Sequence, residues 1–235
     1  MITHEQYLER VQAAKRIVFF GGAGVSTESG IPDFRSVDGL YNQKYDVPPE
    51  VMLSADYFYD HTKEFYEFYF DKMIATWAKP NAAHKKLAEW EKAGKLSAVV
   101  TQNIDGLHQM AGSRSVFELH GSVHRNHCTR CGKSFTLDDV LKSKPDIPKC
   151  DECGGIVKPD VVLYGEMLPE AAVEGAVQAI ACADMLIVGG TSLTVYPAAG
   201  MVHYFRGKRE NLIVINKSVI GGFDNQLNGS IGELL

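Results

Sequence analysis

Four short apolar runs, each followed by a polar or glycine-rich turn, constrain the fold of this chain most. The runs are 17-IVFF-20, 97-SAVV-100, 185-MLIVGG-190 and 212-LIVIN-216, and helical patterns lie between them. Continuous apolar runs of this length are typical of strands that are buried on both faces of a sheet. The alternation predicts an α/β fold with a doubly wound parallel sheet, and we expect a further short strand at 161-VVLY-164.

Two segments interrupt this alternation. Residues 36–80 are rich in aromatic side chains, and residues 121–157 contain two pairs of cysteines. Within the first segment, residues 57–77 place apolar side chains at i, i+3 and i+4 spacing, which predicts one amphipathic helix. We expect its apolar stripe to pack on the sheet or in a small subdomain, with a surface for cofactor stacking as the alternative. The stripe consists of Phe65, Phe68, Tyr69, Met73 and Trp77.

Charge and hydropathy argue against several classes of partner. The 235 residues include 24 Lys and Arg against 29 Asp and Glu, which gives a net charge of -5. Nucleic acids and anionic membranes both require a cationic face, so we expect neither as a partner. No apolar run approaches the roughly 20 residues that span a bilayer, and the polar start of the chain is no signal peptide. We therefore expect a cytoplasmic protein, and we see no sign of an obligate partner.

Four of the five cysteines form two closely spaced pairs. Cys128 and Cys131 make the first CxxC pair, Cys150 and Cys153 make the second, and 18 residues separate the pairs. This spacing is typical of a structural zinc site, in which four thiolates close a tetrahedral shell and leave no position for catalysis. We predict one structural zinc ion, with replacement of a cysteine ligand by one of the two histidines just before Cys128 as the alternative.

A glycine-rich turn follows the first predicted strand, in the stretch IVFFGGAGVSTESGIPDFRS. Gly22 and Gly24 fit the dinucleotide-binding pattern G-x-G-x-x-G, but Thr27 holds its third position. Glycines let the backbone approach a pyrophosphate, so we expect a dinucleotide loop, with a tight turn that binds nothing as the alternative. Phe34 and Arg35 then suit a covering loop, because Arg can meet phosphate and Phe can exclude water.

Polar side chains also follow the second predicted strand. Gln102, Asn103 and Asp105 come directly after it in TQNIDGLH, and His120 follows in ELHG. The carboxyl ends of strands in open α/β sheets are where ligands bind. A histidine there is a candidate general base, because its pKa lies close to neutral pH. We interpret His108, in the same stretch, as structural or solvent-facing.

The last two predicted strands end in small polar residues. Thr191 and Ser192 follow one strand in GGTSL, and Asn216 ends the other in INKS. Hydroxyl and amide groups at strand ends suit contacts to phosphate or ribose. Each signal alone is weak, because turns of this composition are common.

Together these residues resemble the sirtuin family of NAD-dependent protein deacylases. The matching blocks cover nearly the whole chain and occur in the order of the family: GAGVSTESGIPDFR, TQNIDGLH, ELHGSV, the two CxxC pairs, VVLYGEMLP, GGTSL and IN. The resemblance implies a larger Rossmann-like, NAD-binding domain made of residues 1–35, 81–120 and 158–235. It also implies a smaller domain, in which the helical insert 36–80 joins the zinc module 121–157, with the active cleft between the domains.

The resemblance also implies which residues bind each part of the two substrates. The NAD loop would consist of Gly22, Ala23, Gly24, Thr27, Phe34 and Arg35. The nicotinamide carboxamide would lie among Ser26, Asn103, Ile104 and Asp105, with Gln102 at the adjoining ribose. The phosphates and adenosine would meet Gly190, Thr191, Ser192, Asn216 and Ile231. An acyl-lysine peptide would add a strand to Val161, Val162, Leu163, Tyr164 and Gly165, with Phe34 and Val195 also in contact.

The reaction that the resemblance implies consumes NAD. The acyl oxygen attacks C1′ of the nicotinamide ribose while Asn103 and Asp105 hold the leaving nicotinamide, and His120 acts as the base. Water completes the reaction, and the products are nicotinamide, 2′-O-acyl-ADP-ribose and free lysine. Mono-ADP-ribosyl transfer from the same site stays open as the alternative.

Two departures from the family pattern bear on the acyl group. Leu163 and Tyr164 stand where many members have Phe. Members that remove acidic acyl groups carry a Tyr-x-x-Arg pair, whereas this chain has Tyr66 followed by Tyr69. We therefore predict a preference for neutral acyl groups such as acetyl.

Two interpretations from outside the family stay open. A Rossmann oxidoreductase that transfers hydride would need a glycine in place of Thr27 and an acidic residue after the second strand. A zinc-ribbon interaction module would explain the cysteines but would give no function to Asn103, Asp105 and His120.

Overall fold

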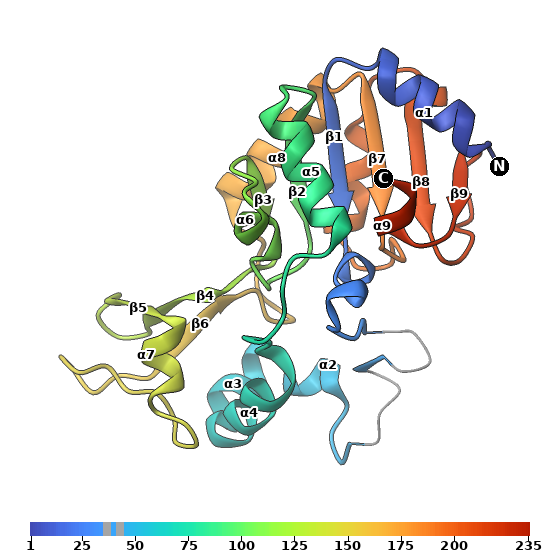
Figure 1. The fold of residues 1–235 in the computed structure, drawn as a ribbon. Coiled ribbons are helices and arrows are strands. Elements are labelled where there is room, and N and C mark those ends of the chain that lie inside the picture. The colour runs from blue at the N-terminus through green and yellow to red at the C-terminus, as the bar shows by residue number, and fades with distance from the viewer. Residues whose placement is uncertain (35–38, 41–44) are drawn as a thin grey trace.

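The computed structural model of the chain describes residues 1–34, 39–40 and 45–235. Figure 1 shows a larger part built on a six-stranded parallel sheet, and a smaller part with a three-stranded antiparallel sheet and short helices. In the described residues, no helix is both long enough and apolar enough to cross a membrane.

The large sheet confirms the predicted doubly wound fold. Its strands, in spatial order, are β3 (Val116–Glu118), β2 (Leu96–Thr101), β1 (Ile17–Gly21), β7 (Met185–Gly189), β8 (Leu212–Asn216) and β9 (Gln226–Asn228), and every neighbouring pair is parallel. The chain runs outward from β1 to β3 and later returns to the other side of β1 with β7. The strand order therefore reverses between β1 and β7, which is the place where folds of this kind bind ligands.

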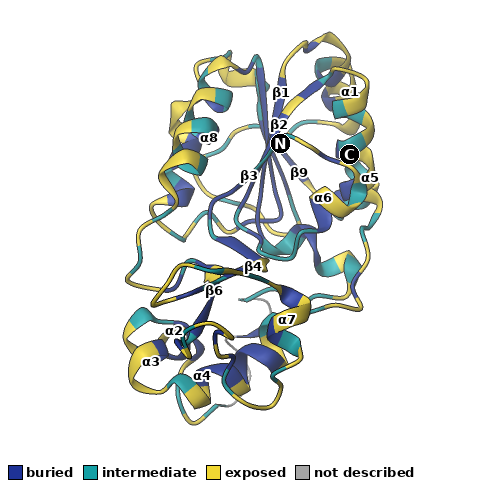
Figure 2. Cartoon of the chain, turned by 90° about the vertical axis from the view of Figure 1, so that its left-hand side faces the viewer, coloured by how far each residue is buried: buried dark blue, intermediate teal, exposed yellow. Residues whose placement is uncertain are grey.

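Helices cover both faces of this sheet, which explains why its central strands are apolar throughout. Ile17 and Phe19 of β1 pack into one core, whereas Val18 and Phe20 pack into another on the opposite face. Figure 2 shows the buried strands between α8 on one side and α1 and α5 on the other. The helices of the first face are α1 (His4–Ala13), α5 (Ala82–Lys92), α6 (Leu107–Ala111) and α9 (Ile231–Leu234). The second face carries α8 (Glu170–Cys182) and the 3-10 helix η5 (Ala198–Tyr204), and a further short turn, η6 (Arg209–Asn211), precedes β8.

The start of α5 is tied to the glycine-rich loop. Asn81 caps this helix by accepting a hydrogen bond from the His84 N–H at 3.3 Å. The Asn81 amide also donates to the Val25 carbonyl at 2.7 Å, inside the 3-10 turn η1 (Ala23–Val25) that follows β1. One side chain therefore fixes both the helix and the loop, which continues into the turn η2 (Thr27–Ser29).

The smaller part combines the two segments that interrupt the alternation. Its sheet has the strand order β5 (Ser134–Thr136), β4 (Gly121–Cys128), β6 (Val157–Val161). Its helical elements are α2 (Pro49–Met52), α3 (Ala55–Asp60), α4 (Thr62–Phe68), the π-helical turn η4 (Tyr69–Met73) and α7 (Leu137–Leu141). Phe65 and Tyr69 from the helical insert share one core with Cys128 and Val157 from the cysteine module. The residue limits that we expect for the two domains stay a prediction.

Two expectations about secondary structure are wrong. Residues 57–77 do not form one helix, because the backbone breaks at His61 between α3 and α4, and the helical region ends at Met73. Phe65 and Tyr69 are buried as expected, but Trp77 lies beyond the helix and is 61% exposed.

The strand expected at residues 161–164 is the second error, since only Val161 belongs to a strand. Beyond β6, the Val162 N–H bonds to the carbonyl of His120, and the Tyr164 N–H bonds to the carbonyl of Leu53. The segment thus alternates between two different neighbours, and neither of them continues alongside it as a strand.

Candidate active site

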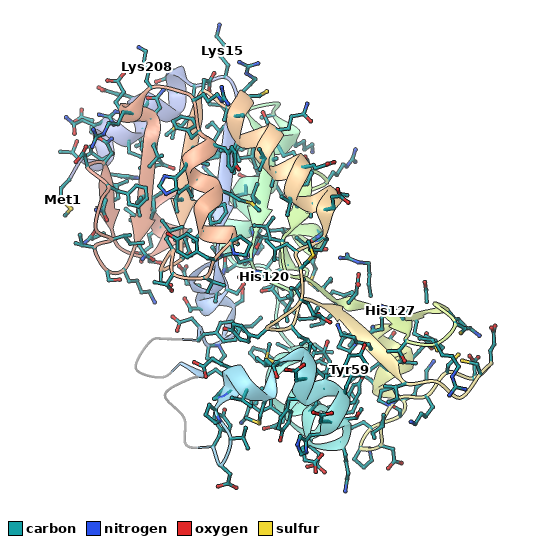
Figure 3. All side chains as sticks on the ribbon, turned by 180° about the vertical axis from the view of Figure 1, so that it is seen from behind. Met1, Lys15, Tyr59, His120, His127 and Lys208 are labelled. Carbon is teal, nitrogen blue, oxygen red and sulfur yellow. The ribbon has the colours of Figure 1, made fainter. Side chains whose placement is uncertain are left out.

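The carboxyl ends of the large sheet open into a cavity of about 1110 Å³ that both parts of the molecule line. Figure 3 shows His120 at the junction of the two parts, with His127 well inside the smaller one. The cavity collects nearly all the site residues predicted from the sequence. They are Ala23, Gly24, Ser26, Thr27, Phe34, Gln102, Asn103, Ile104, Asp105, His120, Val161, Val162, Leu163, Tyr164, Gly165, Gly190, Thr191, Ser192, Val195, Asn216 and Ile231.

Two predicted cofactor residues are not among them. Arg35 lies outside the described residues. Gly22 lies behind the cavity wall, where a Cβ atom would come within 2.8 Å of the Thr191 Cβ. Its absent side chain thus allows the loops after β1 and β7 to pack together.

The glycines of these two loops are required by backbone packing. The Gly24 N–H donates to the Gly190 carbonyl at 2.8 Å, and a Cβ on Gly24 would lie 2.8 Å from the Gly190 Cα. Gly190 itself has a φ of +58°, and a Cβ there would lie 2.4 Å from the Val25 nitrogen. Only glycine fits such an approach, so these residues bring the two strand-end loops together at the point where the strand order reverses.

A chain of hydrogen bonds joins the loop after β1 to the loop after β2. The Asn103 amide donates to the Ser26 hydroxyl at 3.0 Å, and this hydroxyl donates to Asp105 Oδ2 at 2.6 Å. Asp105 Oδ1 accepts from the Leu107 N–H at 2.9 Å, which fixes the carboxylate at the start of α6. Ser26 is 1% exposed and Asn103 is 9% exposed. These hydrogen-bonded side chains therefore form a preorganised polar wall that is little exposed to solvent.

His120 is held as a neutral base. Its Nδ1 lies 3.0 Å from the Gln102 carbonyl, which can only accept, so Nδ1 carries the proton and Nε2 keeps its lone pair. Burial lowers the pKa of His120 below its ordinary value of 6.5, although the bond to Gln102 opposes the shift. The ring is therefore neutral at pH 7 and can act as a base through Nε2.

Gln102 and Thr191 connect β2 with the loop after β7. The Thr191 hydroxyl donates to Gln102 Oε1 at 3.0 Å and accepts from the Leu193 N–H at 3.2 Å. The Asn216 amide donates to the Thr191 carbonyl at 3.2 Å. The Gln102 Nε2 is buried and has no hydrogen-bond partner within the described part of the chain. A buried donor without an acceptor is costly, so this amide is suited to a polar group of a ligand.

The predicted substrate segment, residues 161–165, keeps backbone groups of Val162 and Gly165 available. The Val162 N–H, Leu163 N–H and Tyr164 N–H are all bonded within the protein. Among the described residues, the Val162 carbonyl and the Gly165 N–H have no hydrogen bond. These two groups can bond to an extended peptide laid along the cavity.

Comparison with known proteins decides the family. The model of the Sir2 family matches residues 22–197, which is most of the chain. The chain belongs to the Sir2 family. The resemblance to sirtuins found in the sequence is thereby confirmed.

Relatives of this Sir2-family chain match along most of their own length. It is 61% identical to a Clostridium acetobutylicum protein named NAD-dependent protein deacetylase, over 96% of this chain and 93% of that protein. A Staphylococcus aureus protein of the same name is 46% identical, over 88% of this chain and 84% of that protein.

Solved Sir2 structures share the fold. A Sir2 variant with a deacetylated p53 peptide and 3′-O-acetyl ADP-ribose superposes with a TM-score of 0.90 at 38% identity, covering 99% of this chain and 95% of that one. A Sir2 complex with a p53 peptide and NAD+ superposes with a TM-score of 0.85 at 38% identity, with the same coverage.

The four paired cysteines of this sirtuin gather at one point in the smaller part. Their sulfur atoms all lie within 4.8 Å of one another, and Cys128 Sγ lies 3.4 Å from Cys153 Sγ. Sulfur atoms about 3.8 Å apart are what zinc with four thiolate ligands requires, so the group fits one structural zinc ion. Among the described residues, no histidine joins this group: His124 Nε2 lies 3.1 Å from the Asp105 carbonyl, and His127 Nδ1 lies 3.8 Å from Asp160 Oδ1.

His108 is buried at 1% exposure, so the solvent-facing interpretation is wrong and the structural one holds. Its ring contacts the ring of His84, which is 0% exposed, with ring centroids 4.7 Å apart. Burial lowers the pKa of His108 to about 3 and that of His84 to about 4. Both rings are therefore neutral packing groups behind the cavity wall.

Several polar residues that line the cavity were not predicted from the sequence, among them Glu28, Lys72, His124 and Glu166. Glu28 accepts hydrogen bonds from the Ser230 hydroxyl at 2.6 Å and the Gly232 N–H at 3.1 Å, and so holds the start of α9. Of these four, Glu28 and Glu166 could have been noticed, because they lie inside the matching blocks GAGVSTESGIPDFR and VVLYGEMLP. The other two reach the cavity through tertiary structure.

Proposed function

We propose that this sirtuin removes acyl groups from lysine side chains of proteins, prefers acetyl and other neutral acyl groups, and consumes NAD as its co-substrate. The observation that carries the proposal is the convergence of three features on one cavity. These are the polar wall of Ser26, Asn103 and Asp105, a neutral His120, and the available backbone groups of the 161–165 segment. The relatives named as NAD-dependent protein deacetylases support it.

The residues of the cavity fit NAD. When bound, NAD supplies an electrophilic ribose carbon and nicotinamide as a leaving group. The wall of Ser26, Asn103 and Asp105 offers both a carboxylate and an amide, which match the donor and acceptor groups of a carboxamide. The unpartnered Gln102 Nε2 can donate to a ribose oxygen, and Phe34 can exclude water from the reacting face.

His120 would act as the general base. The Gln102 carbonyl holds its ring by Nδ1, so Nε2 is the atom that accepts the proton. Because burial lowers its pKa, the ring is neutral before the reaction and takes up the proton only when a ribose hydroxyl is activated.

The protein substrate would bind as an extended strand. The Val162 carbonyl can accept, and the Gly165 N–H can donate, one hydrogen bond each to the acyl-lysine peptide. Tyr164, 41% exposed, offers an aromatic surface beside them. We also propose that the enzyme works in the cytoplasm, where a cluster of four thiolates stays reduced.

The test is the rate of NAD-dependent deacetylation of an acetyl-lysine peptide by the native protein and by two histidine variants. His120→Ala should lose activity by about two to four orders of magnitude, as removal of a general base does, and should keep the fold. The matched control is His203→Ala, because His203 is exposed and is not part of the cavity. A His120→Ala protein that keeps the native rate would refute the role of His120 as the base.

A further inference from the structure

A buried lysine lies directly behind the segment proposed to bind substrate. The side chain of Lys158, in β6, is only 7% exposed. Its Nζ donates to the carbonyls of Pro159 at 3.3 Å and Val161 at 3.2 Å, and it pairs with Glu166 Oε2 at 3.1 Å. The ammonium group thus has one acceptor for each of its three N–H groups, as a buried charge requires.

Glu166 holds the same segment from its other end. Its Oε2 also accepts the Leu163 N–H at 2.8 Å, and its own N–H donates to the Leu163 carbonyl at 2.9 Å. One carboxylate oxygen therefore bonds both to Lys158 and to the middle of the segment. Through the pair, the Val161 carbonyl, the Leu163 N–H and Glu166 are fixed relative to one another.

The bonds of this pair flank the Val162 carbonyl and the Gly165 N–H, which we expect to bond to a peptide. The Val162 carbonyl lies between two residues that the pair holds, and the Gly165 N–H directly precedes Glu166. Gly165 has a left-handed φ of +93°, and a Cβ there would meet nothing within 4 Å. Lack of space therefore does not require glycine at this position, and only the left-handed φ favours it.

Stability alone gives little reason for such a pair. Removing two charges from water costs about as much as their attraction returns, so buried ion pairs rarely add net stability. They can, however, select one conformation among several. In the described structure, Lys158 Nζ donates to carbonyls of β6 and to Glu166, and it lies 5.9 Å from the centre of the Phe58 ring in α3.

We propose that Lys158 and Glu166 are positioning residues that hold residues 161–166 in the conformation that captures the acyl-lysine peptide. The inference rests on the proposed function, and it assigns to the pair the affinity for peptide and not the affinity for NAD. Neither residue takes part in the chemical step.

Three variants separate positioning from stability: Lys158→Met, Glu166→Gln and the double variant. Each single variant removes the charge partner of the other residue, and Glu166→Gln leaves the buried Lys158 ammonium unpaired. Both should unfold at lower temperature, whereas the double variant should recover most of the loss. In the double variant, KM for an acetyl-lysine peptide should stay raised about tenfold, the effect of one lost hydrogen bond to a charged group, while KM for NAD stays native. The control is Lys142→Met, because Lys142 forms an exposed ion pair with Asp139 in the same part of the molecule.

A double variant that regains the native KM for peptide would overturn the proposal, because the pair would then serve stability alone. An equal rise of both KM values would overturn it as well. Failure of the proposed function gives a different result, namely no NAD-dependent deacetylation by the native protein. In that event, fluorescence anisotropy of a labelled acetyl-lysine peptide still tests the pair, because binding needs no turnover. Weaker binding by the double variant supports the proposal, and unchanged binding refutes it.

Discussion

Mild acid should destabilise this protein through the two histidines buried behind the cavity. His84 and His108 are 0% and 1% exposed, and their rings are in contact. Burial lowers the pKa of both from 6.5, to about 4 for His84 and about 3 for His108. The charges of Asp105 and Glu28 oppose the lowering of the His84 pKa. The charge of His84 lowers the pKa of His108 further.

The direction of the effect follows from the protonation of the two states. Below pH 6.5 the rings take up protons in the unfolded chain but stay neutral in the folded one. The stability due to neutral rings is therefore complete above pH 6.5 and is lost as the pH falls toward the folded-state values. Each pH unit in this window costs about 1.4 kcal/mol for each histidine, so each should have removed about 2 kcal/mol by pH 5.

Urea unfolding followed by circular dichroism at about pH 7.5 and about pH 5 measures this loss. The native protein should lose about 4 kcal/mol through the pair, and His108→Leu, which cannot titrate, should lose about 2 kcal/mol less. The exposed His203→Leu should behave as the native protein does. If His108→Leu loses as much stability between the two pH values as the native protein, the assignment of acid sensitivity to this pair is wrong.

Three further predictions concern the active site and the zinc site. The acid limb of kcat/KM should lie below pH 6.5, because burial lowers the pKa of His120; a limb centred above 6.5 would contradict this. Cys128→Ala removes one of four zinc ligands, so thermal stability, activity and the zinc content measured by atomic absorption should fall together. Full zinc content in this variant would argue against the four-thiolate site. Deacetylation should be faster than desuccinylation, because no unpaired cation is expected to meet a succinyl carboxylate. Tyr69 stands in the position of the family's arginine, and Lys72 is already paired with Asp71 at 2.8 Å. Equal rates on matched peptides would refute this.

The central strands of the fold could be predicted because they are buried on both faces. Strands such as β1 and β7 are apolar at nearly every position, and such runs are visible in a single sequence. The edge strands β3 and β9 have three residues each, too few to show a period. The break at His61 was also hidden, because the apolar spacing continues through it while the backbone does not.

The cavity could be predicted where residues directly follow a strand. Asn103 and Thr191 stand at such positions, so topology alone brings them together. His124 could not be found in this way, because its partner Asp105 lies in another loop, and Lys158 could not, because it stands inside β6 and not after a strand. His124, for example, reaches the Asp105 carbonyl across Gly106, where a Cβ would lie 2.7 Å from the histidine ring.

The most direct test of the account is mass spectrometry of a reaction that contains the protein, an acetyl-lysine peptide and NAD. The account predicts loss of the acetyl mass from the peptide, with one nicotinamide and one acetyl-ADP-ribose formed for each lysine released. Nicotinamide release with the acetyl group retained would indicate a transferase or glycohydrolase. Untouched NAD across a panel of acyl peptides would contradict the assignment of Asn103, Asp105 and His120 to a site that cleaves nicotinamide from NAD.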